Sequence, residues 1–324
     1  MTLVIALLVA LAATPMVVVA AHRWALIDEP NHRSSHVVPI PRGGGLAVAV
    51  AAVVALVVTE RASAVIGLAV GASIVAAVGL ADDRFGLPAV PRLIAQLIVP
   101  VAVGVVVIDR SGARLVLALV VAAFLVAAYI NAFNFMDGIN GISGSQAAIS
   151  GAFLAAVGAR IEAPAITAAG LAVCGAALGF LPYNAVKARI FLGDVGSYFL
   201  GFWLAGLALL VVDAGVAAAV VAGPFVLYVM DTSVVIVRRA RRGDRLTEAH
   251  REHAYQRLTQ AGWSHLSVTA VCAAVSAVCA LIMYALIDSA GRLQVAGLAV
   301  CVVIVAGYLV LPGLLDRRVE GERR

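Results

Sequence analysis

The sequence predicts an all-α polytopic membrane protein with about eleven transmembrane helices. Hydrophobic residues make up 63% of its 324 residues and charged residues only 13%, and the mean hydropathy is +1.05. A soluble domain cannot bury that much apolar surface. The apolar segments are long, continuous and rich in Ala, Leu and Val, whereas the strands of a membrane barrel alternate in hydrophobicity. The polar residues, in contrast, collect in a few connecting segments.

The apolar segments have the composition of membrane spans, although several are shorter than the roughly 20 residues that a bilayer requires. The first lacks the basic n-region of a cleaved signal peptide, and further spans follow it. We therefore expect residues 1–324 to form a single transmembrane domain. The expected spans are residues 2–21, 45–59, 64–81, 91–108, 115–130, 145–158, 164–182, 198–212, 215–236, 267–287 and 293–311.

The basic residues predict the orientation of the chain. Of the 23 Lys and Arg residues, one alternate set of connections carries only Arg61, Arg110, Arg114, Arg160 and Arg292. The positive-inside rule places the other set in the cytoplasm, with the N-terminus outside and the C-terminus inside. The cytoplasmic set contains the C-terminal tail and the loops 22–44, 82–92, 131–144, 183–197 and 237–266. Because these loops carry most of the polar residues, a site on the cytoplasmic face is expected, as in an enzyme rather than a carrier.

The first cytoplasmic loop contains the stretch "DEPNHRSSHVVPIPRGGG", residues 28–45. Arg33 and Arg42 are cations that can bind phosphate oxygens. The glycines that follow allow the backbone to approach a ligand or a neighbouring helix closely. A solvated turn with positive-inside charges explains this stretch equally well.

The second loop begins with two adjacent acids, Asp82 and Asp83, at the end of a span. Neighbouring residues on a helix point about 100° apart, so these two side chains should not chelate one ion together. We expect one to act as a base or metal partner and the other to bind a cation such as Arg84 or Arg92. An interfacial helix cap is the alternative, but two acids at a membrane boundary are costly enough to favour a function.

The third loop reads "NAFNFMDGINGISG", residues 131–144. Asn131, Asn134 and Asp137 recur every three residues, so they lie along one side of a helix. An Asn side chain both donates and accepts, which suits the edge of a uracil or the hydroxyls of a sugar. Its carbonyl oxygen can also bind a hard cation. Three amides and a carboxylate exceed what a turn between spans requires.

The fourth loop places Asp194 between Gly193 and Gly196, just before a span. A lone carboxylate beside flexible backbone at the start of a helix can hold a metal ion against a phosphate. Taken alone, Asp194 could equally be a helix N-cap.

The fifth loop carries "HREHAYQRL", residues 250–258. His250 and His253 are three residues apart on an expected helix with Arg251 between them, which suits phosphate binding or proton transfer better than zinc. The arginines of residues 238–242 are expected to anchor a helix end at the anionic leaflet. Asp231, near the inner end of its span, should face the bundle and meet a cation or an amide, and so support the site.

In this order, the five motifs resemble those of the polyprenyl-phosphate N-acetylhexosamine-1-phosphate transferases of glycosyltransferase family 4, the superfamily of WecA, TagO, WbpL and MraY. The resemblance extends from residue 28 to about residue 265 and is closest to the WbpL- and WecA-like branch. It implies transfer of a sugar-1-phosphate from a UDP-N-acetylhexosamine to polyprenyl phosphate, either undecaprenyl or decaprenyl. The products would be polyprenyl-diphosphate-sugar and UMP, in the first membrane step of a cell-surface glycan pathway. The sugar, the lipid length and the glycan stay open.

The resemblance also implies a Mg²⁺ or Mn²⁺ cofactor, a bacterial plasma membrane with its lipids as partners, and no nucleic acid; it leaves a homodimer open. The implied metal ligands are Asp194 and Asn134. The other implied site residues are Asp82, Asp83, His250 and His253 as catalytic residues, and Asn131, Asp137, Asn140, Arg251, Arg33 and Arg42 for the substrates. A transporter or lipid flippase, a phosphotransferase acting on CDP-alcohols and an inactive scaffold relative are the alternatives. The clustering of polar residues at one face and the intact acidic motifs argue against them.

Overall fold

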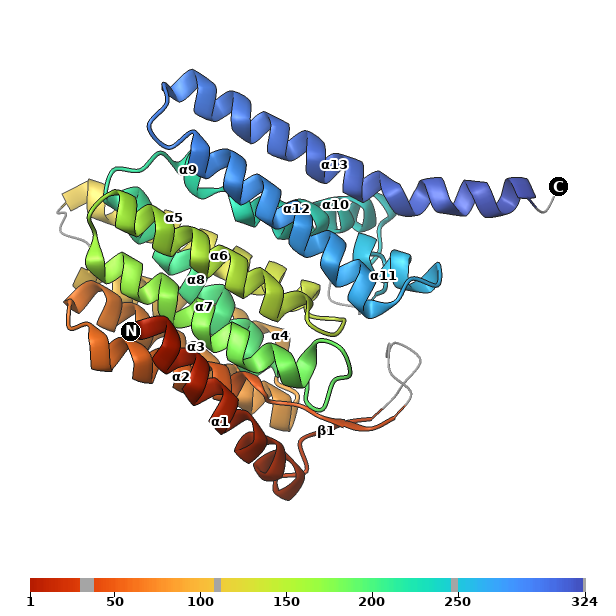
Figure 1. The fold of residues 1–324 in the computed structure, drawn as a ribbon, viewed down its shortest axis with the longest axis horizontal. Helices are drawn as coiled ribbons and strands as arrows, with labels where there is room; N and C mark the ends of the chain where they lie inside the picture. The colour runs from red at the N-terminus through yellow and green to blue at the C-terminus, as the bar shows by residue number, and fades with distance from the viewer. Residues whose placement is uncertain (30–37, 108–111, 246–249, 323–324) are drawn as a thin grey trace.

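The computed structural model describes residues 1–29, 38–107, 112–245 and 250–322, and these residues form a bundle of long helices (Figure 1). The predicted all-α class is confirmed, because the described residues hold only one pair of short strands, β1 (Ile27–Asp28) and β2 (Ile40–Pro41), which pair antiparallel. The helices are α1 (Thr2–Arg23), α2 (Gly45–Thr59), α3 (Ser63–Phe85), α4 (Ala89–Val107), α5 (Gly112–Met136), α6 (Ile142–Arg160), α7 (Pro164–Asn184), α8 (Gly193–Asp213), α9 (Ala218–Val221), α10 (Val226–Arg242), α11 (Ala254–Gln260), α12 (His265–Ala285) and α13 (Gly291–Glu322).

Eight of the described helices are long and apolar enough to cross a membrane, so the chain is a multi-pass membrane protein. These are α1, α3, α5, α6, α7, α8, α12 and α13. Two further apolar helices, α2 and α4, are shorter. Each expected span except residues 215–236 overlaps one described helix, and the count of eleven and the orientation stay predictions.

The segment expected as one span at residues 215–236 is interrupted. α9 ends at Val221, a 3₁₀ turn occupies Gly223–Phe225, and α10 begins only at Val226. The turn contains Pro224, which has no N–H to continue a helical ladder. Within a bilayer, backbone groups freed by such a break must find partners inside the protein. Gln146 of α6 provides one, since its Nε2 donates to the Pro224 carbonyl at 2.6 Å.

Small residues bring α8 against its neighbours, as is common for helices that pack in membranes. At Gly79 of α3, an added Cβ would collide with the backbone carbonyl of Asp194. At Gly45 of α2, it would collide with the backbone of Gly196. These contacts place the N-terminus of α8 directly against the end of α3, where Asp82 and Asp83 lie.

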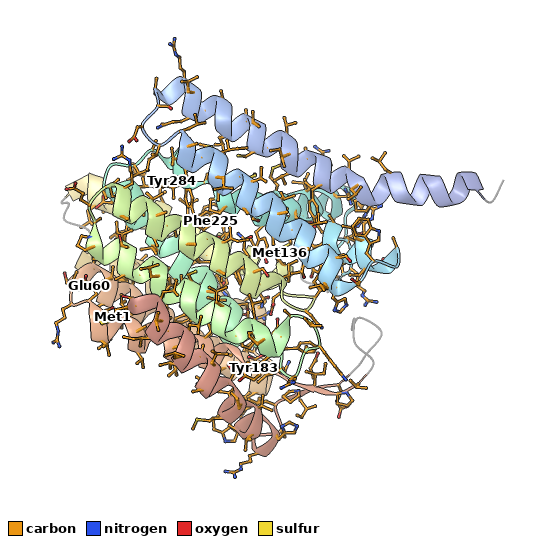
Figure 2. All side chains as sticks on the ribbon, viewed as in Figure 1. Met1, Glu60, Met136, Tyr183, Phe225 and Tyr284 are labelled. Atoms are coloured by element: carbon orange, nitrogen blue, oxygen red, sulfur yellow. The ribbon has the colours of Figure 1, made fainter. Side chains whose placement is uncertain are left out.

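The expected cytoplasmic loops lie at one end of the bundle. Figure 1 shows β1, the α7–α8 connection and α11 at this end, and the α12–α13 connection at the opposite end. Figure 2 likewise shows Tyr183 near this end and Glu60 at the other. Backbone hydrogen bonds join the first loop to the fourth, because the Phe191 N–H donates to the Pro41 carbonyl at 2.8 Å and the Phe191 carbonyl accepts from the Gly44 N–H at 2.9 Å.

Candidate active site

A cavity of about 500 Å³ opens at this end of the bundle. Its walls come from α4, from the end of α5 and the two residues that follow it, from α8, and from the segment around α11. Three of the five motif loops therefore contribute lining residues directly, although they lie far apart in the sequence. The lining residues are Ala89, Arg92, Leu93, Asn131, Asn134, Phe135, Asp137, Gly138, Tyr198, His250, His253, Tyr255 and Gln256.

Asp83 binds the N-terminus of α8. Its Oδ1 accepts from the backbone N–H of Asp194 at 3.1 Å, and its Oδ2 accepts from that of Val195 at 3.0 Å. The first N–H groups of a helix have no partner within the helix, and an anion there is also favoured by the helix dipole. Arg42 approaches the same carboxylate, with 3.8 Å between its Nε and Oδ1, and it also donates to the Asp83 backbone carbonyl. Asp83 therefore links the first, second and fourth loops.

Asp82 points to other partners, as the separation of neighbouring helical side chains requires. Its Oδ1 accepts from the Leu87 N–H at 2.8 Å. Its Oδ2 accepts from Arg92 Nη1 at 2.6 Å and from the Tyr198 hydroxyl at 2.9 Å. The prediction that one of the two acids binds a cation such as Arg92 is confirmed for Asp82. The prediction that the other acts as a base or metal partner stays a prediction. Arg84 is exposed, and its guanidinium lies over the Phe85 ring instead.

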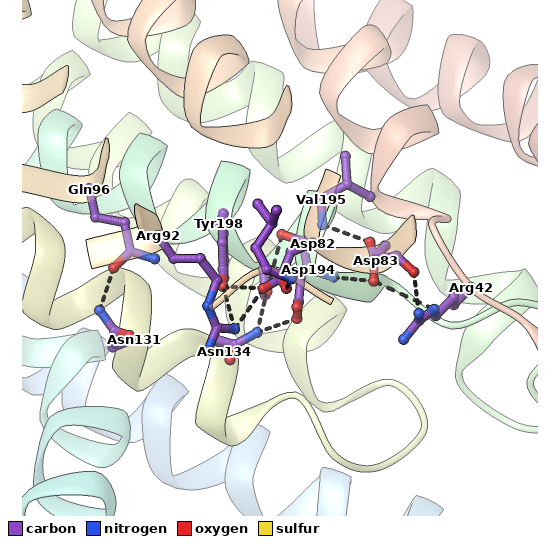
Figure 3. Close-up of polar contacts among 12 residues, drawn as sticks. Arg42, Asp82, Asp83, Arg92, Gln96, Asn131, Asn134, Asp194, Val195 and Tyr198 are labelled. Carbon is purple, nitrogen blue, oxygen red and sulfur yellow. Dashed lines mark hydrogen bonds and ion pairs between the residues drawn. The ribbon is translucent and has the colours of Figure 1, made fainter. Parts of the chain in front are cut away.

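Asp194 meets the amide of Asn134, whose Nδ2 donates to Asp194 Oδ1 at 2.6 Å and to the Ser197 hydroxyl at 2.9 Å. The carboxyls of Asp82 and Asp194 also lie close enough to interact directly (Figure 3). Asp194 does not itself line the cavity, and it reaches the lining through Asn134. Because Asp83 already caps α8, the Asp194 side chain is not needed as an N-cap.

Asn131 lines the same wall one helical turn earlier. Its Nδ2 donates to the Gln96 side chain at 2.6 Å and to the Ala127 carbonyl at 2.7 Å. Both amide protons are therefore engaged, which leaves its carbonyl oxygen as the atom that can accept from a ligand.

Burial shifts the pKa of two titratable groups of the lining in the direction that favours their neutral forms. Burial, reinforced by the negative charge of Asp83, raises the pKa of Asp137 to about 7 against the opposing Ser143 hydrogen bond. Burial, together with the charge of His253, lowers the pKa of His250 to about 4. Both shifts have the direction that desolvation produces, since it disfavours the charged form of either group.

His253 makes stacking contacts with two aromatic rings. Its ring stacks on Phe135 with the centroids 6.3 Å apart and on Tyr255 with the centroids 5.8 Å apart. The Tyr255 hydroxyl donates to the Phe135 carbonyl at 3.0 Å, which ties this stack to the end of α5. Nδ1 of His253 lies 3.1 Å from Oδ1 of Asp231, and both side chains are almost completely buried. The expectation that Asp231 faces the bundle and meets a cation or an amide is thus met by an imidazole.

The oxygen donors beside the cavity suit a hard divalent cation. Asp82, which also binds Arg92, and Asp194 bring two carboxylates together, and Asn134 adds an amide. No group of three or more His, Cys, Asp or Glu side chains in the described part of the chain is arranged to hold a metal. Two carboxylates and an amide nevertheless suit Mg²⁺, because Mg²⁺ is commonly held by one or two carboxylates and completed by substrate phosphates and water.

Comparison with known proteins identifies the family. The model of glycosyl transferase family 4 matches residues 65–212. The chain is 31% identical to the decaprenyl-phosphate N-acetylglucosaminephosphotransferase of Mycobacterium tuberculosis, over 80% of this chain and 75% of that relative. The chain belongs to glycosyl transferase family 4. Another member is the probable undecaprenyl-phosphate N-acetylglucosaminyl 1-phosphate transferase of Bacillus subtilis, 28% identical over 81% of this chain and 77% of the relative.

A third relative is a phospho-N-acetylmuramoyl-pentapeptide-transferase of Clostridium beijerinckii, which is 29% identical over 62% of this chain and 65% of its own length. The family predicted from the five motifs is therefore confirmed.

The structure of this family member brings most of the expected site residues together, but not all of them. Asn140 and Arg251 do not line the cavity. The Asn140 carbonyl accepts from the Thr269 hydroxyl at 2.8 Å, and the Arg251 carbonyl accepts from Gln260 at 3.1 Å. Arg42 reaches the site only through Asp83, and Arg33 lies outside the described residues.

Two further polar residues belong to the site but were not expected from the sequence. Tyr198 lies four residues after Asp194, so the helical period alone places both on one face of α8. Gln96 lies four residues after Arg92 on α4 by the same rule. The signal in the sequence that could have found both residues is a polar side chain one helical turn away from a motif residue. Both residues are buried, in segments that are otherwise apolar.

Proposed function

We propose that this protein transfers an N-acetylhexosamine-1-phosphate from a UDP-sugar to a polyprenyl phosphate, releasing UMP. As a family 4 member it is a phosphotransferase, and the names of its relatives specify decaprenyl or undecaprenyl phosphate as the acceptor. The donor nucleotide, the metal and the roles of individual residues are our proposal. The cavity supports this assignment, because it lies at an end of a membrane bundle where a soluble nucleotide can meet a lipid phosphate.

The observation that carries the proposal is the pairing of Asp82 and Asp194 beside the Asn134 amide, across a cavity from two histidines. Both reactants are anionic, so their mutual repulsion must be offset for them to meet. Asp194 and Asn134 would hold Mg²⁺ or Mn²⁺, which neutralises phosphate charge when bound. His250 and His253 line the same cavity, where an imidazole N–H can donate to a phosphate oxygen.

The bond changes follow from the substrates. An oxygen of the lipid phosphate attacks the sugar-bearing phosphorus of the donor, a new P–O bond forms, and the bond from that phosphorus to the bridging oxygen of UMP breaks. The UMP leaves with the electron pair of that bond. A phosphate monoester has a second pKa near 6, so at neutral pH the lipid phosphate is mostly a dianion and needs no strong base.

Asp82 is better placed to orient than to accept a proton. Both of its oxygens already accept hydrogen bonds, from the Leu87 N–H, from Arg92 and from Tyr198. We therefore assign Asp82 to holding Arg92 and Tyr198 at the cavity wall, where the guanidinium can face the phosphates. Carboxylate–guanidinium hydrogen bonds are among the stronger ones and fix the geometry of both partners.

UMP release tests the proposal. Purified protein in detergent is given UDP-GlcNAc or a related UDP-N-acetylhexosamine, together with decaprenyl or undecaprenyl phosphate and Mg²⁺. We expect UMP release that requires the lipid and stops when EDTA removes the metal. Release without lipid would indicate a hydrolase, and no release with any donor from folded protein would overturn the proposal.

We also place the protein in a bacterial plasma membrane with the cavity facing the cytoplasm, because UDP-sugars are made there. The four cysteines are buried, so introduced cysteines can be labelled against a low background. Ser264→Cys precedes α12 at the cavity end, and Ala290→Cys lies in the α12–α13 connection. An impermeant thiol reagent applied to intact cells should label Ala290→Cys and leave Ser264→Cys unmodified; the reverse pattern would invert the assigned orientation.

A further inference from the structure

We propose that Asp231 is a positioning residue that holds His253 so that its Nε2 faces the diphosphate of the donor substrate. This inference rests on the proposed function, but its test below can be decided separately. Asp231 lies on α10, after the break in the expected ninth span, and it is not part of any of the five motifs. Asp231 is only 1% exposed. A carboxylate that faced lipid would cost free energy, so the side chain is expected to face the interior of the bundle.

The Asp231 carboxylate fixes the orientation of the His253 imidazole. Nδ1 of His253 donates to Asp231 Oδ1 at 3.1 Å. The Ala254 N–H donates to the same carboxylate, at 3.3 Å from Oδ1 and 3.1 Å from Oδ2. One side chain of α10 thus sets both the rotation of the ring and the start of α11. With the proton on Nδ1 fixed in this way, Nε2 is the nitrogen that a ligand can use.

The other ring nitrogen of His253, Nε2, is left for a ligand. His253 lines the cavity, yet its Nε2 is buried and has no hydrogen-bond partner among the described residues. A buried polar atom without a partner costs free energy, so such an atom calls for an explanation, and a ligand provides one. The hydrogen bond from Nδ1 to Asp231 fixes the ring, and the stacking contacts with Phe135 and Tyr255 support this orientation.

The chemistry of Nε2 indicates the class of ligand. While Nδ1–H is bonded to the Asp231 carboxylate, a proton on Nε2 makes this nitrogen a donor to an anion. The groups that face the ring are Asp231 from α10, His250 and Tyr255 from its own segment, and Phe135 from α5. The only carboxylate in direct contact with the ring among the described residues is Asp231. A phosphate oxygen of a nucleoside diphosphate fits the open side.

Asp231→Asn tests this role with little change of shape. The Asn carbonyl can still accept from the Ala254 N–H, but the negative charge beside Nδ1 of His253 is lost. We expect kcat for UMP release to fall by about 10- to 100-fold, by analogy with the loss typical when the hydrogen-bond partner of a metal-ligating histidine is removed. The affinity for UDP, measured by calorimetry, should fall as well, while the thermal midpoint stays near that of the wild type.

Thr232→Val is the matched control. Thr232 is the next residue on α10, is also buried, and its hydroxyl has no hydrogen-bond partner among the described residues. This substitution changes the polarity of α10 without touching His253, and we expect wild-type kcat. A loss equal to that of Asp231→Asn would mean that α10 tolerates no change here, and it would overturn the specific role of Asp231.

A double-mutant cycle separates positioning from a merely structural role. His253→Asn keeps an N–H that can donate to Asp231 but removes Nε2, so it should fold and lose activity to a similar extent. If Asp231 acts through His253, Asp231→Asn adds no more than about a twofold loss in that background, because coupled residues are not additive. Losses that multiply would overturn the inference.

The same cycle can be read from UDP affinity alone. If wild-type protein released no UMP with any donor, the proposed function would fail, yet weaker and non-additive UDP binding would still support the role of Asp231. Should Asp231→Asn fail to fold, His253→Asn decides: normal turnover and normal UDP affinity in that variant would sink the idea.

Discussion

The Asp83 carboxylate accepts a hydrogen bond from the backbone N–H of Asp194 at 3.1 Å, so an acid at the end of α3 positions an acid at the start of α8. The second carboxylate oxygen holds the next N–H, that of Val195, at 3.0 Å. This relationship explains how the start of α8 is fixed against the end of α3. It also explains why the Asp194 side chain is available to Asn134 and to a ligand rather than capping its own helix.

Asp83→Asn should destabilise the protein and lower its activity together. The neutral amide carries less charge toward the α8 N-terminus and can present only one oxygen. Asp83 is 3% exposed, and a buried hydrogen bond to a charged acceptor contributes about 2 kcal/mol. We expect a lower thermal midpoint and a smaller kcat, because Asp194 would no longer be held in place. An unchanged midpoint would show that Gly79 and its neighbours position α8 without this cap.

Asp194→Ala should abolish turnover while the protein still folds. The substitution removes the carboxylate assigned to the metal, and it also removes a buried acidic group that lies beside Asp82 and Asp83. Because burying an acidic group among other acids is unfavourable, the thermal midpoint should stay equal to or above that of the wild type. UMP release and the midpoint are measured on the same preparation. Normal turnover would remove the metal assignment from Asp194.

Gly79→Ala should impair both folding and activity. An added Cβ would collide with the Asp194 carbonyl, which is backbone and cannot swing away. α3 and α8 would have to separate, and such overpacking costs about 1–3 kcal/mol. Gly307→Ala on α13 is the control, because an added Cβ there meets nothing within 4 Å. Circular dichroism melts in detergent and UMP release should separate the two variants clearly.

Arg92→Ala should reduce activity far more than Arg238→Ala. Arg92 contacts Asp82 and Tyr198 and lines the cavity, whereas Arg238 is exposed on α10. Loss of Arg92 also leaves the buried Asp82 carboxylate without its cation, which is strongly unfavourable. Initial rates at saturating lipid measure the difference. A collapse of activity in Arg238→Ala would show that the basic residues of α10 belong to the site rather than to the leaflet.

The stability of the ligand-free protein should depend on His250 between about pH 4 and pH 6.5. Burial lowers the pKa of His250 to about 4 from the ordinary 6.5, so in this window the unfolded chain binds more protons than the folded one. The folded state therefore has its full relative stability above pH 6.5 and loses it as the pH falls toward 4. Thermal midpoints across this range should drop more steeply for the wild type than for His250→Gln. Equal slopes would mean that His250 titrates normally.

The membrane class and the family can both be predicted from the sequence, because both depend on local patterns of residues. Long apolar runs predict spans wherever they occur. Asn131 and Asn134 both line the cavity because the helical period puts residues three apart on one side of α5, and Asp137 lines it just beyond the end of that helix. The separate partners of Asp82 and Asp83 follow from the same geometry, since adjacent helical side chains diverge.

The contacts between residues that are distant in the sequence, in contrast, depend on the tertiary structure. No local pattern links Asp83 to the start of α8, Gln146 to the carbonyl of Pro224, or Asp231 to His253. Each of these contacts joins a buried polar group to a partner on another helix, and the choice of partner depends on how the helices pack. A polar residue within an apolar span predicts from sequence that a partner exists, because an unpaired group there is costly. Its identity emerges only when small residues such as Gly79 bring particular helices together.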